Sequence, residues 1–189
     1  ATMKTSVYIE VIRQLTDLLK QLSPNEYTKS LGVLNGSSIG QHTRHVVEFY
    51  QCLLAGKASG VVDYDARERN LVFENDLNFT IENLDNIEKN IISIKNPTEM
   101  ILLSVSYCTD NQALIETTFM REMVYLVEHS IHHYALIRIG LQQNFPNIVI
   151  PKKTISKEEI IEEIEIAKAN LQTLSTTQQN KYFTHPIFG

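Results

Sequence analysis

The longest helical pattern in the sequence runs from Phe119 to Gln143 and carries half of the chain's six histidines. A phase advance of about 100° per residue gathers the large apolar side chains of this segment on one face. They are Phe119, Met123, Leu126, Ile137 and Leu141. A long helix with one apolar face has to pack that face against other elements, so the pattern predicts a protein built mainly from packed helices.

Two histidines of this segment, His129 and His133, lie four residues apart. Side chains at this spacing have Cβ atoms about 5 to 6 Å apart on a helix, so both imidazoles can reach one metal ion at about 2.0 to 2.1 Å. Both lie on the side of the apolar face, whereas His132 projects to the opposite side. The spacing permits chelation without requiring it, because such pairs also occur as ordinary surface residues or hydrogen-bond donors.

Apolar residues recur at helical spacing in four other segments, which predict four further helices. These segments are Lys4 to Leu22, Ile39 to Ala55, Phe79 to about Ile94, and Lys157 to Leu174. We expect Ser37 and Ser38 to supply the cap of the second of them and Gly56 to end it. Ser156 is the expected cap of the last helix, which is amphipathic and acidic.

Two segments between the helices have other patterns. Gly60 to Asn78 has no sustained period and many charges, and we expect a long ordered crossover there. Ile101 to Val105 and Ala113 to Thr117 predict a β-hairpin, with a turn at Thr109-Asp110-Asn111. The sequence therefore predicts a single domain over residues 1–189, a four-helix bundle with a long crossover, a small hairpin and an extra C-terminal helix.

Composition excludes several classes of protein. The net charge is −5 and no block of Lys and Arg is present, which argues against nucleic-acid binding. No apolar run approaches the roughly 20 residues that span a bilayer. The two cysteines, Cys52 and Cys108, are too few and too far apart for a disulfide framework. We therefore expect a soluble, cytoplasmic protein without nucleic-acid or membrane partners.

The predicted helix from Ile39 to Ala55 carries two more histidines, His42 and His45. Metal sites in helical bundles lie between facing helices, so a third ligand should come from another helix. His42 lies nearer the middle of the apolar face and His45 on its flank. A lone histidine on an apolar face is more often a satisfied core residue than a ligand. Helical phase alone does not decide between the two.

Two parts of the sequence together resemble the DinB/YfiT-like superfamily of metalloproteins. They are Ser38 to Glu48 and, far downstream, Arg121-Glu122-Met123 with Glu128 to Ala135. The resemblance extends from the first helix to about Gln143. It implies an up-down-down-up four-helix bundle that holds a divalent ion through one histidine of the second helix, followed by an acidic residue, and a His-x3-His pair on a later helix. Matched residue by residue, the implied ligands are His45, with Glu48 at the acidic position, and His129 with His133.

The resemblance also implies a chemistry. Such relatives use the ion to activate a low-molecular-weight thiol for transfer or isomerisation, and others act as metal-dependent hydrolases. Three imidazoles leave a coordination position open, as in catalytic sites. We therefore expect a metal-dependent enzyme that acts on small molecules, a thiol-dependent S-transferase or isomerase or a related hydrolase. Zn or Ni is the expected ion, and Fe, Co and Mn are the other candidates.

Glu48 and Glu122 are candidate catalytic residues, as general bases or as hydrogen-bond partners of the ligating histidines. A glutamate on a helix flank is more often simply solvated, and for either residue alone that interpretation is stronger. The charged crossover stretch Tyr64 to Arg69 either holds an anionic substrate through its arginines or forms a salt-bridge cluster. The salt-bridge cluster is favoured.

Two alternatives to a metalloenzyme remain open. One is a non-catalytic metal-binding bundle with a structural, sensory or oligomerisation role, and the other is a protein without metal whose histidines are merely packed. We also expect a homodimer, because the far side of the longest helix carries more apolar residues than one core needs. These residues are Val124, Ile131, Ala135 and Ile139. The alternative is that the hairpin or the last helix covers them.

Overall fold

The structure, a computed structural model, describes residues 6–106 and 112–151. Within these residues the protein is mainly helical and contains one small three-stranded sheet, which confirms the predicted fold class at this level. The predicted helix from Lys157 to Leu174 and the turn at 109–111 lie outside the described residues. The single domain over residues 1–189 stays a prediction.

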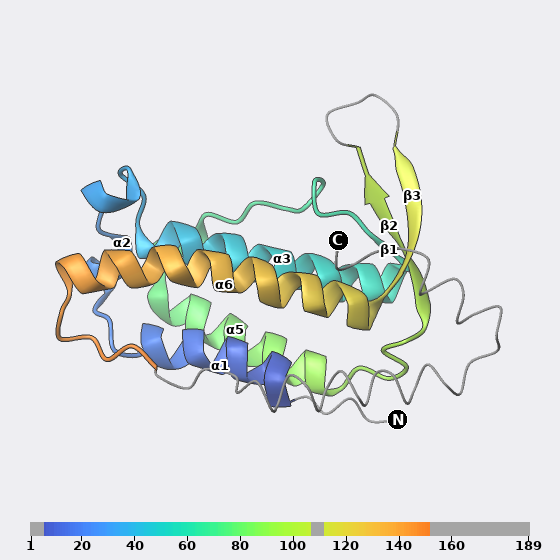
Figure 1. Cartoon of the computed structure of the whole chain (residues 1–189), viewed down its shortest axis with the longest axis horizontal. Coiled ribbons are helices and arrows are strands. Elements are labelled where there is room, and N and C mark those ends of the chain that lie inside the picture. The colour runs from blue at the N-terminus through green and yellow to red at the C-terminus, as the bar shows by residue number, and fades with distance from the viewer. Residues whose placement is uncertain (1–5, 107–111, 152–189) are drawn as a thin grey trace, which may run out of the picture. The chain divides into compact units, whose positions relative to one another are not determined.

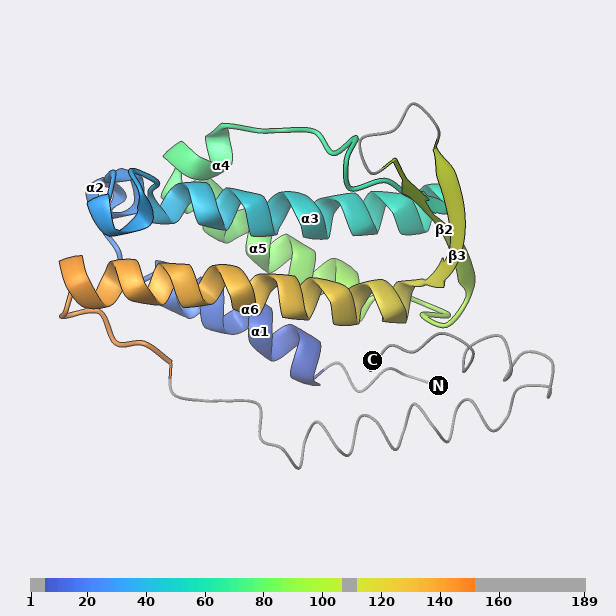
Figure 2. The ribbon, with the colours of Figure 1, turned by 45° about the horizontal axis from the view of Figure 1, so that its top comes forward.

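Four long helices enclose the hydrophobic core. They are α1 (Ser6–Leu19), α3 (Ile39–Ser59), α5 (Leu77–Ile92) and α6 (Phe119–Asn144). Each packs against two of the others, in the cyclic order α1, α5, α3, α6. Helices α1 and α6 run in one direction and α3 and α5 in the opposite one (Figures 1 and 2). Fully buried leucines such as Leu19, Leu53 and Leu84 fill the space between them.

Hydrogen-bonded caps define where these helices begin. Ser38 accepts the backbone N–H of Gln41, while the Gln41 side chain accepts the backbone N–H of Ser38, which forms a capping box at the start of α3. Asp76 caps α5 and Thr118 caps α6 by accepting a backbone N–H of the first turn. The predicted start of the second helix at Ile39 is confirmed, and of the two serines predicted to supply its cap, Ser38 makes it.

The end of α3 differs from the prediction. The helix continues through Gly56 to Ser59, and Gly60 ends it with a φ of +86°. Gly56 is a packing residue, because a Cβ atom there would lie 2.4 Å from Cγ2 of Val62. The prediction that Gly56 ends the helix is therefore wrong. The glycine lets a strand approach the helix closely and does not supply a left-handed turn.

A short helix, α2 (Pro24–Thr28), follows α1 and is not predicted by the helical spacing. Ser23 caps it through a capping box with Glu26. The residues that predict the end of the first helix therefore also begin a new one. Helix α1 ends at Leu19, before the expected Leu22.

The small sheet has the strand order β1, β2, β3. Its strands are β1 (Val61–Val62), β2 (Met100–Val105) and β3 (Ala113–Thr118). Strands β2 and β3 pair antiparallel, with Ile101 opposite Thr117, as the alternating pattern predicts. Strand β1 adds in parallel to β2, with Val61 opposite Leu102. The sequence does not predict β1, because two residues are too short to show an alternation.

The crossover between β1 and α5 runs along α3 in both ribbon views and includes a short helix, α4 (Val72–Asn75) (Figures 1 and 2). The Cys52 thiol donates to the backbone oxygen of Asp63 at 3.1 Å. Helix α4 packs on Gly40, where a Cβ atom would lie 2.3 Å from the backbone oxygen of Glu74. The crossover is thus attached to the helix that carries His42 and His45.

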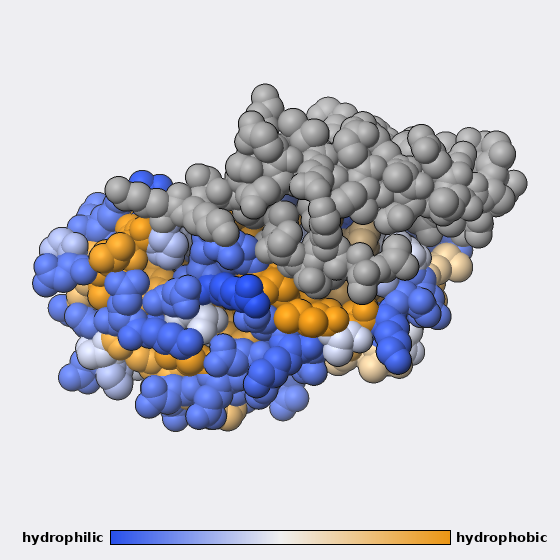
Figure 3. All heavy atoms as spheres, turned by 90° about the horizontal axis from the view of Figure 1, so that it is seen from below, coloured by the Kyte–Doolittle hydropathy of each residue, from blue (hydrophilic) through white to orange (hydrophobic). Residues whose placement is uncertain are grey.

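The described surface carries apolar groups among hydrophilic side chains, as Figure 3 shows for one face. On α6, Val124, Ile131 and Ile139 are 42%, 50% and 41% exposed. Neither the hairpin nor any other described element covers them. The homodimer stays a prediction.

Among the described residues, no helix combines the length and the apolar character that crossing a lipid bilayer demands.

The close contact at Gly56 makes a stability prediction. In a helix interior, replacing glycine with alanine normally stabilises by about 1 kcal/mol. Here the added methyl group would meet Cγ2 and the backbone of Val62 at 2.4 and 2.8 Å, and overpacking of this kind costs about 1 to 3 kcal/mol. We expect Gly56→Ala to lower the free energy of unfolding by about 1 to 2 kcal/mol in urea titrations.

The matched control is Gly32→Ala, because no atom lies within 4 Å of a Cβ at Gly32. This variant should stay within about 0.5 kcal/mol of the wild type. A stabilised Gly56→Ala variant would contradict the close packing of α3 on β1.

Candidate metal centre

Three histidines from two helices meet at the interface between α3 and α6. His45 on α3 and His129 and His133 on α6 each offer one ring nitrogen, and these nitrogens all lie within 4.8 Å of one another. The ring centroids are 4.5 to 5.0 Å apart. One ion held at about 2.0 to 2.1 Å would keep tetrahedral ligand nitrogens about 3.3 Å apart. The structure thus brings together the three residues that the resemblance names.

Helical geometry explains why these side chains meet. His129 and His133 lie one turn apart and point to the same side of α6. Helix α3 runs antiparallel to α6, so that His42 contacts His133 while Phe49 contacts His129. His45 lies between these two contacts and touches both α6 histidines.

Phe49 is the aromatic centre of this cluster. Its ring stacks on His129 at a centroid distance of 4.4 Å and contacts His45 at 4.7 Å. Tyr64 of the crossover stacks on Phe49 at 5.1 Å, and the Arg67 guanidinium carbon lies 4.7 Å from the Phe49 centroid. Helical spacing predicts only that Phe49 lies on the apolar face of its helix. Its position one turn after His45 is the signal that could have placed it beside the histidines.

One imidazole nitrogen in the cluster lacks a hydrogen-bond partner. His129 Nε2 is buried, and no atom of the described residues bonds to it. A buried polar atom without a partner costs about 1 to 3 kcal/mol, so it is a position where a ligand would be favourable. Together with the donor set of three imidazoles, this atom fits a transition-metal ion.

Burial keeps the histidines neutral. It lowers the pKa of His45 to about 4 and that of His133 to about 3, with smaller contributions from neighbouring imidazoles. Burial also lowers the pKa of His129, and His132 and Arg67 add to the effect. Neutral imidazole is the form that binds metal, so at neutral pH these three rings do not have to lose protons before they bind an ion.

Glu48 is almost completely buried, with 2% of its surface exposed. The expectation of a solvated glutamate is therefore wrong here. Its Oε1 accepts the backbone N–H of Asn70 at 2.9 Å, and Arg44 and Arg67 lie 3.6 and 3.7 Å from its carboxylate. Glu48 therefore attaches the crossover to α3, and within the described part of the chain it makes no hydrogen bond to a histidine.

Glu122 is fully buried, so it too contradicts the solvated interpretation. Tyr64 and Thr117 donate their hydroxyl groups to its two oxygens at 2.9 and 2.7 Å, and Arg121 adds an ion pair at 2.9 Å. Glu122 thereby joins the crossover, β3 and α6. Its catalytic role, like that of Glu48, stays a prediction.

Among the described residues, the charged crossover stretch makes one ion pair, between Arg67 and Glu48. Arg67 lies between the Glu48 carboxylate and the Phe49 ring and donates to the Tyr64 backbone oxygen at 2.8 Å. Asp65 accepts the Ser106 hydroxyl at 3.0 Å. Asp65 and Arg69 are both exposed, and the choice between a salt-bridge cluster and an anion site stays a prediction.

The two remaining histidines near the cluster have different environments. His132 is exposed on α6, as its helical phase predicts. His42 is half-buried, and its Nδ1 lies 3.2 Å from Nδ1 of His133. It does not belong to the group of three whose nitrogens lie within 4.8 Å of one another.

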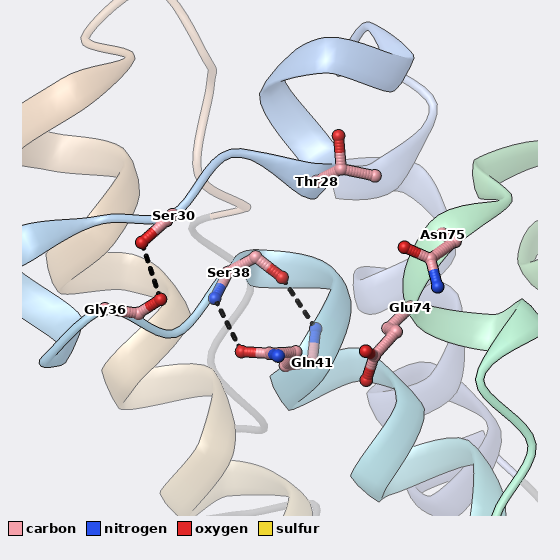
Figure 4. A pocket seen from close by; sticks show the side chains of 7 residues that line it. All are labelled: Thr28, Ser30, Gly36, Ser38, Gln41, Glu74 and Asn75. Carbon is pink, nitrogen blue, oxygen red and sulfur yellow. Dashed lines mark hydrogen bonds between the residues drawn. The ribbon is translucent and has the colours of Figure 1, made fainter.

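A separate cavity of about 100 Å³ lies beside the start of α3 (Figure 4). Its polar walls come from the end of α2, from the loop before α3, from the first turn of α3 and from α4. The lining residues are Thr28, Ser30, Gly36, Ser38, Gln41, Glu74 and Asn75. Ser38 and Gln41 bond to each other through the capping box, and Ser30 bonds to the Gly36 backbone oxygen. Glu74 Oε2 forms an ion pair with Arg44 but has no hydrogen-bond partner among the described residues, and none of the histidines lines the cavity.

Comparison with known proteins gives one local similarity. A stretch of 83 residues is 34% identical to FK506-binding protein 5 of Rhizopus delemar, which covers 41% of this chain and 21% of the fungal protein. The chain thus spans about a fifth of that relative. No protein-family model and no solved structure matches the chain.

The buried imidazoles predict how the stability of the metal-free protein depends on pH. The folded-state pKa values of His45 and His133, about 4 and about 3, lie below the ordinary value of 6.5. As the pH falls from 6.5 towards 4, the unfolded chain therefore binds protons that the folded protein does not, so the free energy of unfolding should decrease. Urea titrations in the presence of a chelator measure this loss.

The double variant His45→Asn, His133→Asn should lose much of this pH dependence, whereas the exposed control His132→Asn should retain it. In the wild type, Arg44, Arg67, His42 and His129 face these rings, and all four are retained in the double variant and in the control. Because the rings are half-buried, solvent screening reduces the size of the effect. Equal pH dependence in the double variant and the control would show that it does not originate in these imidazoles.

Proposed function

We propose that this chain is a divalent-metal-binding protein of the DinB/YfiT-like type and that His45, His129 and His133 hold the ion. The convergence of three imidazoles from α3 and α6 is the observation that carries the proposal. The directions of the four long helices support the resemblance, because α1 and α6 oppose α3 and α5, as an up-down-down-up bundle requires. The buried, unpartnered His129 Nε2 argues against the alternative of merely packed histidines.

We further propose a metal-dependent enzyme that acts on small molecules. Three imidazoles are fewer ligands than Zn or Ni accepts, so a substrate group can approach the ion. When bound, such an ion supplies Lewis acidity that lowers the pKa of a thiol or a water and so provides a nucleophile near neutral pH. A thiol-dependent S-transferase or isomerase is the first candidate, and a hydrolase with the same site is the second.

The surrounding residues suit this chemistry. Arg67 contributes positive charge next to His45 and His129, which favours a thiolate over a neutral thiol. On the crossover side, Tyr64 stacks on Phe49, which in turn contacts His45 and His129. Glu48 and Glu122 hold the crossover over the cluster through Asn70 and Tyr64. The homodimer that we propose would use the exposed apolar residues of α6.

Metal binding is tested by zinc titration of untagged protein and of single alanine variants of the three histidines. We expect one zinc ion per chain in the wild type. Loss of a hydrogen-bond partner of a ligand already costs 10 to 100-fold in affinity, so His45→Ala, His129→Ala and His133→Ala should each lose more than about 100-fold.

His132→Ala is the matched control, because this exposed residue lies next to His133 and does not belong to the group of three histidines. Its zinc affinity should stay within about threefold of the wild type. Circular dichroism of every variant excludes unfolding as the cause of lost binding. A wild-type protein that binds no zinc, nickel or cobalt would refute the proposed function.

Catalysis is tested with zinc- and nickel-loaded protein in two assays. One combines glutathione or cysteine with an electrophilic aromatic chloride, and the other measures ester hydrolysis. We expect turnover in at least one assay that is lost in His129→Ala and retained in His132→Ala. Stoichiometric metal binding without turnover in either assay would favour the non-catalytic metal-binding bundle.

A further inference from the structure

His42 contacts His133, although His42 is neither one of the three clustered histidines nor part of the apolar core. It lies one helical turn before His45 on α3, and its Nδ1 is 3.2 Å from Nδ1 of His133. A hydrogen bond between two ring nitrogens needs one N–H and one lone pair. The two neutral imidazoles therefore have to adopt defined and complementary tautomers.

Only one direction of this bond is compatible with a ligating His133. If His42 donates, His133 Nδ1 is the acceptor, and the neutral His133 ring carries its proton on Nε2, where it blocks ligation through that atom. If His133 donates from Nδ1, its Nε2 lone pair is free. The second arrangement gives His133 what a ligating histidine usually has, an acceptor for its other N–H.

We propose that His42 is a positioning residue that accepts the Nδ1–H of His133 and so directs the Nε2 lone pair of His133 towards the ion. The inference rests on the proposed metal site and adds a residue to it. Carboxylates or backbone oxygens usually take this part, but Glu48 and Glu122 bond to Asn70, Tyr64 and Thr117.

His42 is distinguished from a fourth ligand by its position. The structure places the nitrogens of His45, His129 and His133 within 4.8 Å of one another, and His42 is not part of that group. Its ring centroid lies 5.5 Å from that of His133, whereas the His45 centroid lies 4.5 Å from it. His42 therefore acts on the ion through His133.

Two substitutions at the same position test the inference. The Oδ1 of asparagine is as many bonds from Cα as the Nδ1 of histidine, so His42→Asn retains an acceptor where the structure has one. His42→Leu has a similar reach and no acceptor. We expect His42→Leu to lose 10 to 100-fold in zinc affinity, measured by competition with a chelator, and His42→Asn to lose less than about fivefold.

Cobalt provides a readout that separates a positioning residue from a fourth ligand. The absorption bands of the cobalt-loaded protein report the ligand set, so wild type, His42→Leu and His42→Asn should have the same band positions and intensities at saturation. Nitrogen-15 spectra of the zinc-loaded wild type should show a protonated Nδ1 on His133. The control His132→Leu removes a neighbouring exposed imidazole and should leave affinity and spectra unchanged.

The outcomes are distinct. Wild-type zinc affinity in His42→Leu would overturn the positioning role and leave the metal site intact. If both variants lose zinc affinity equally and their cobalt bands differ from those of the wild type, His42 is a fourth ligand instead. Equal losses with unchanged cobalt bands would show a packing role and would also overturn the inference. If the wild-type protein binds neither zinc nor cobalt, the proposed function fails and this inference fails with it.

Discussion

The packing of α3 against α6 determines the rest of the structure, because it takes three imidazoles partly out of water at one place. Isolated imidazoles lose hydration there, and burial is the largest cause of the lowered pKa values of His45 and His133. A core built only for stability would place leucines at such positions. The half-buried imidazoles at this interface, with the unpartnered His129 Nε2 among them, are the features on which the proposed metal site rests.

The crossover forms a second layer around this interface. It is held by two buried carboxylates, Glu48 and Glu122, whose partners come from different segments of the chain. Removing one partner of a buried, hydrogen-bonded charge is costly, so each attachment is strong although the crossover has little regular structure. Glu48, three residues after His45, thus contacts the histidine cluster only through the crossover that it holds.

Helical spacing predicts the four long helices within a few residues at most ends, because one face of each is buried against the others. It cannot predict Gly56 as a packing residue or the pairing of β1, since both depend on a contact between segments. Phase places His129 and His133 together, but only the resemblance selects His45 over His42. Helical phase places Glu122 on the apolar side of α6, but its partner Tyr64 was not predictable, because Tyr64 belongs to a segment without periodicity.

The stack of Tyr64, Phe49 and His129 has a consequence for the entropy of binding. A free histidine side chain has several rotamers. If three such side chains become fixed only when an ion binds, the entropy they lose reduces the binding free energy. Here Phe49 restricts two of the rings before any ligand arrives, so folding already provides that order. Ligand affinity at the cluster should therefore depend on an aromatic residue that offers no donor atom at all.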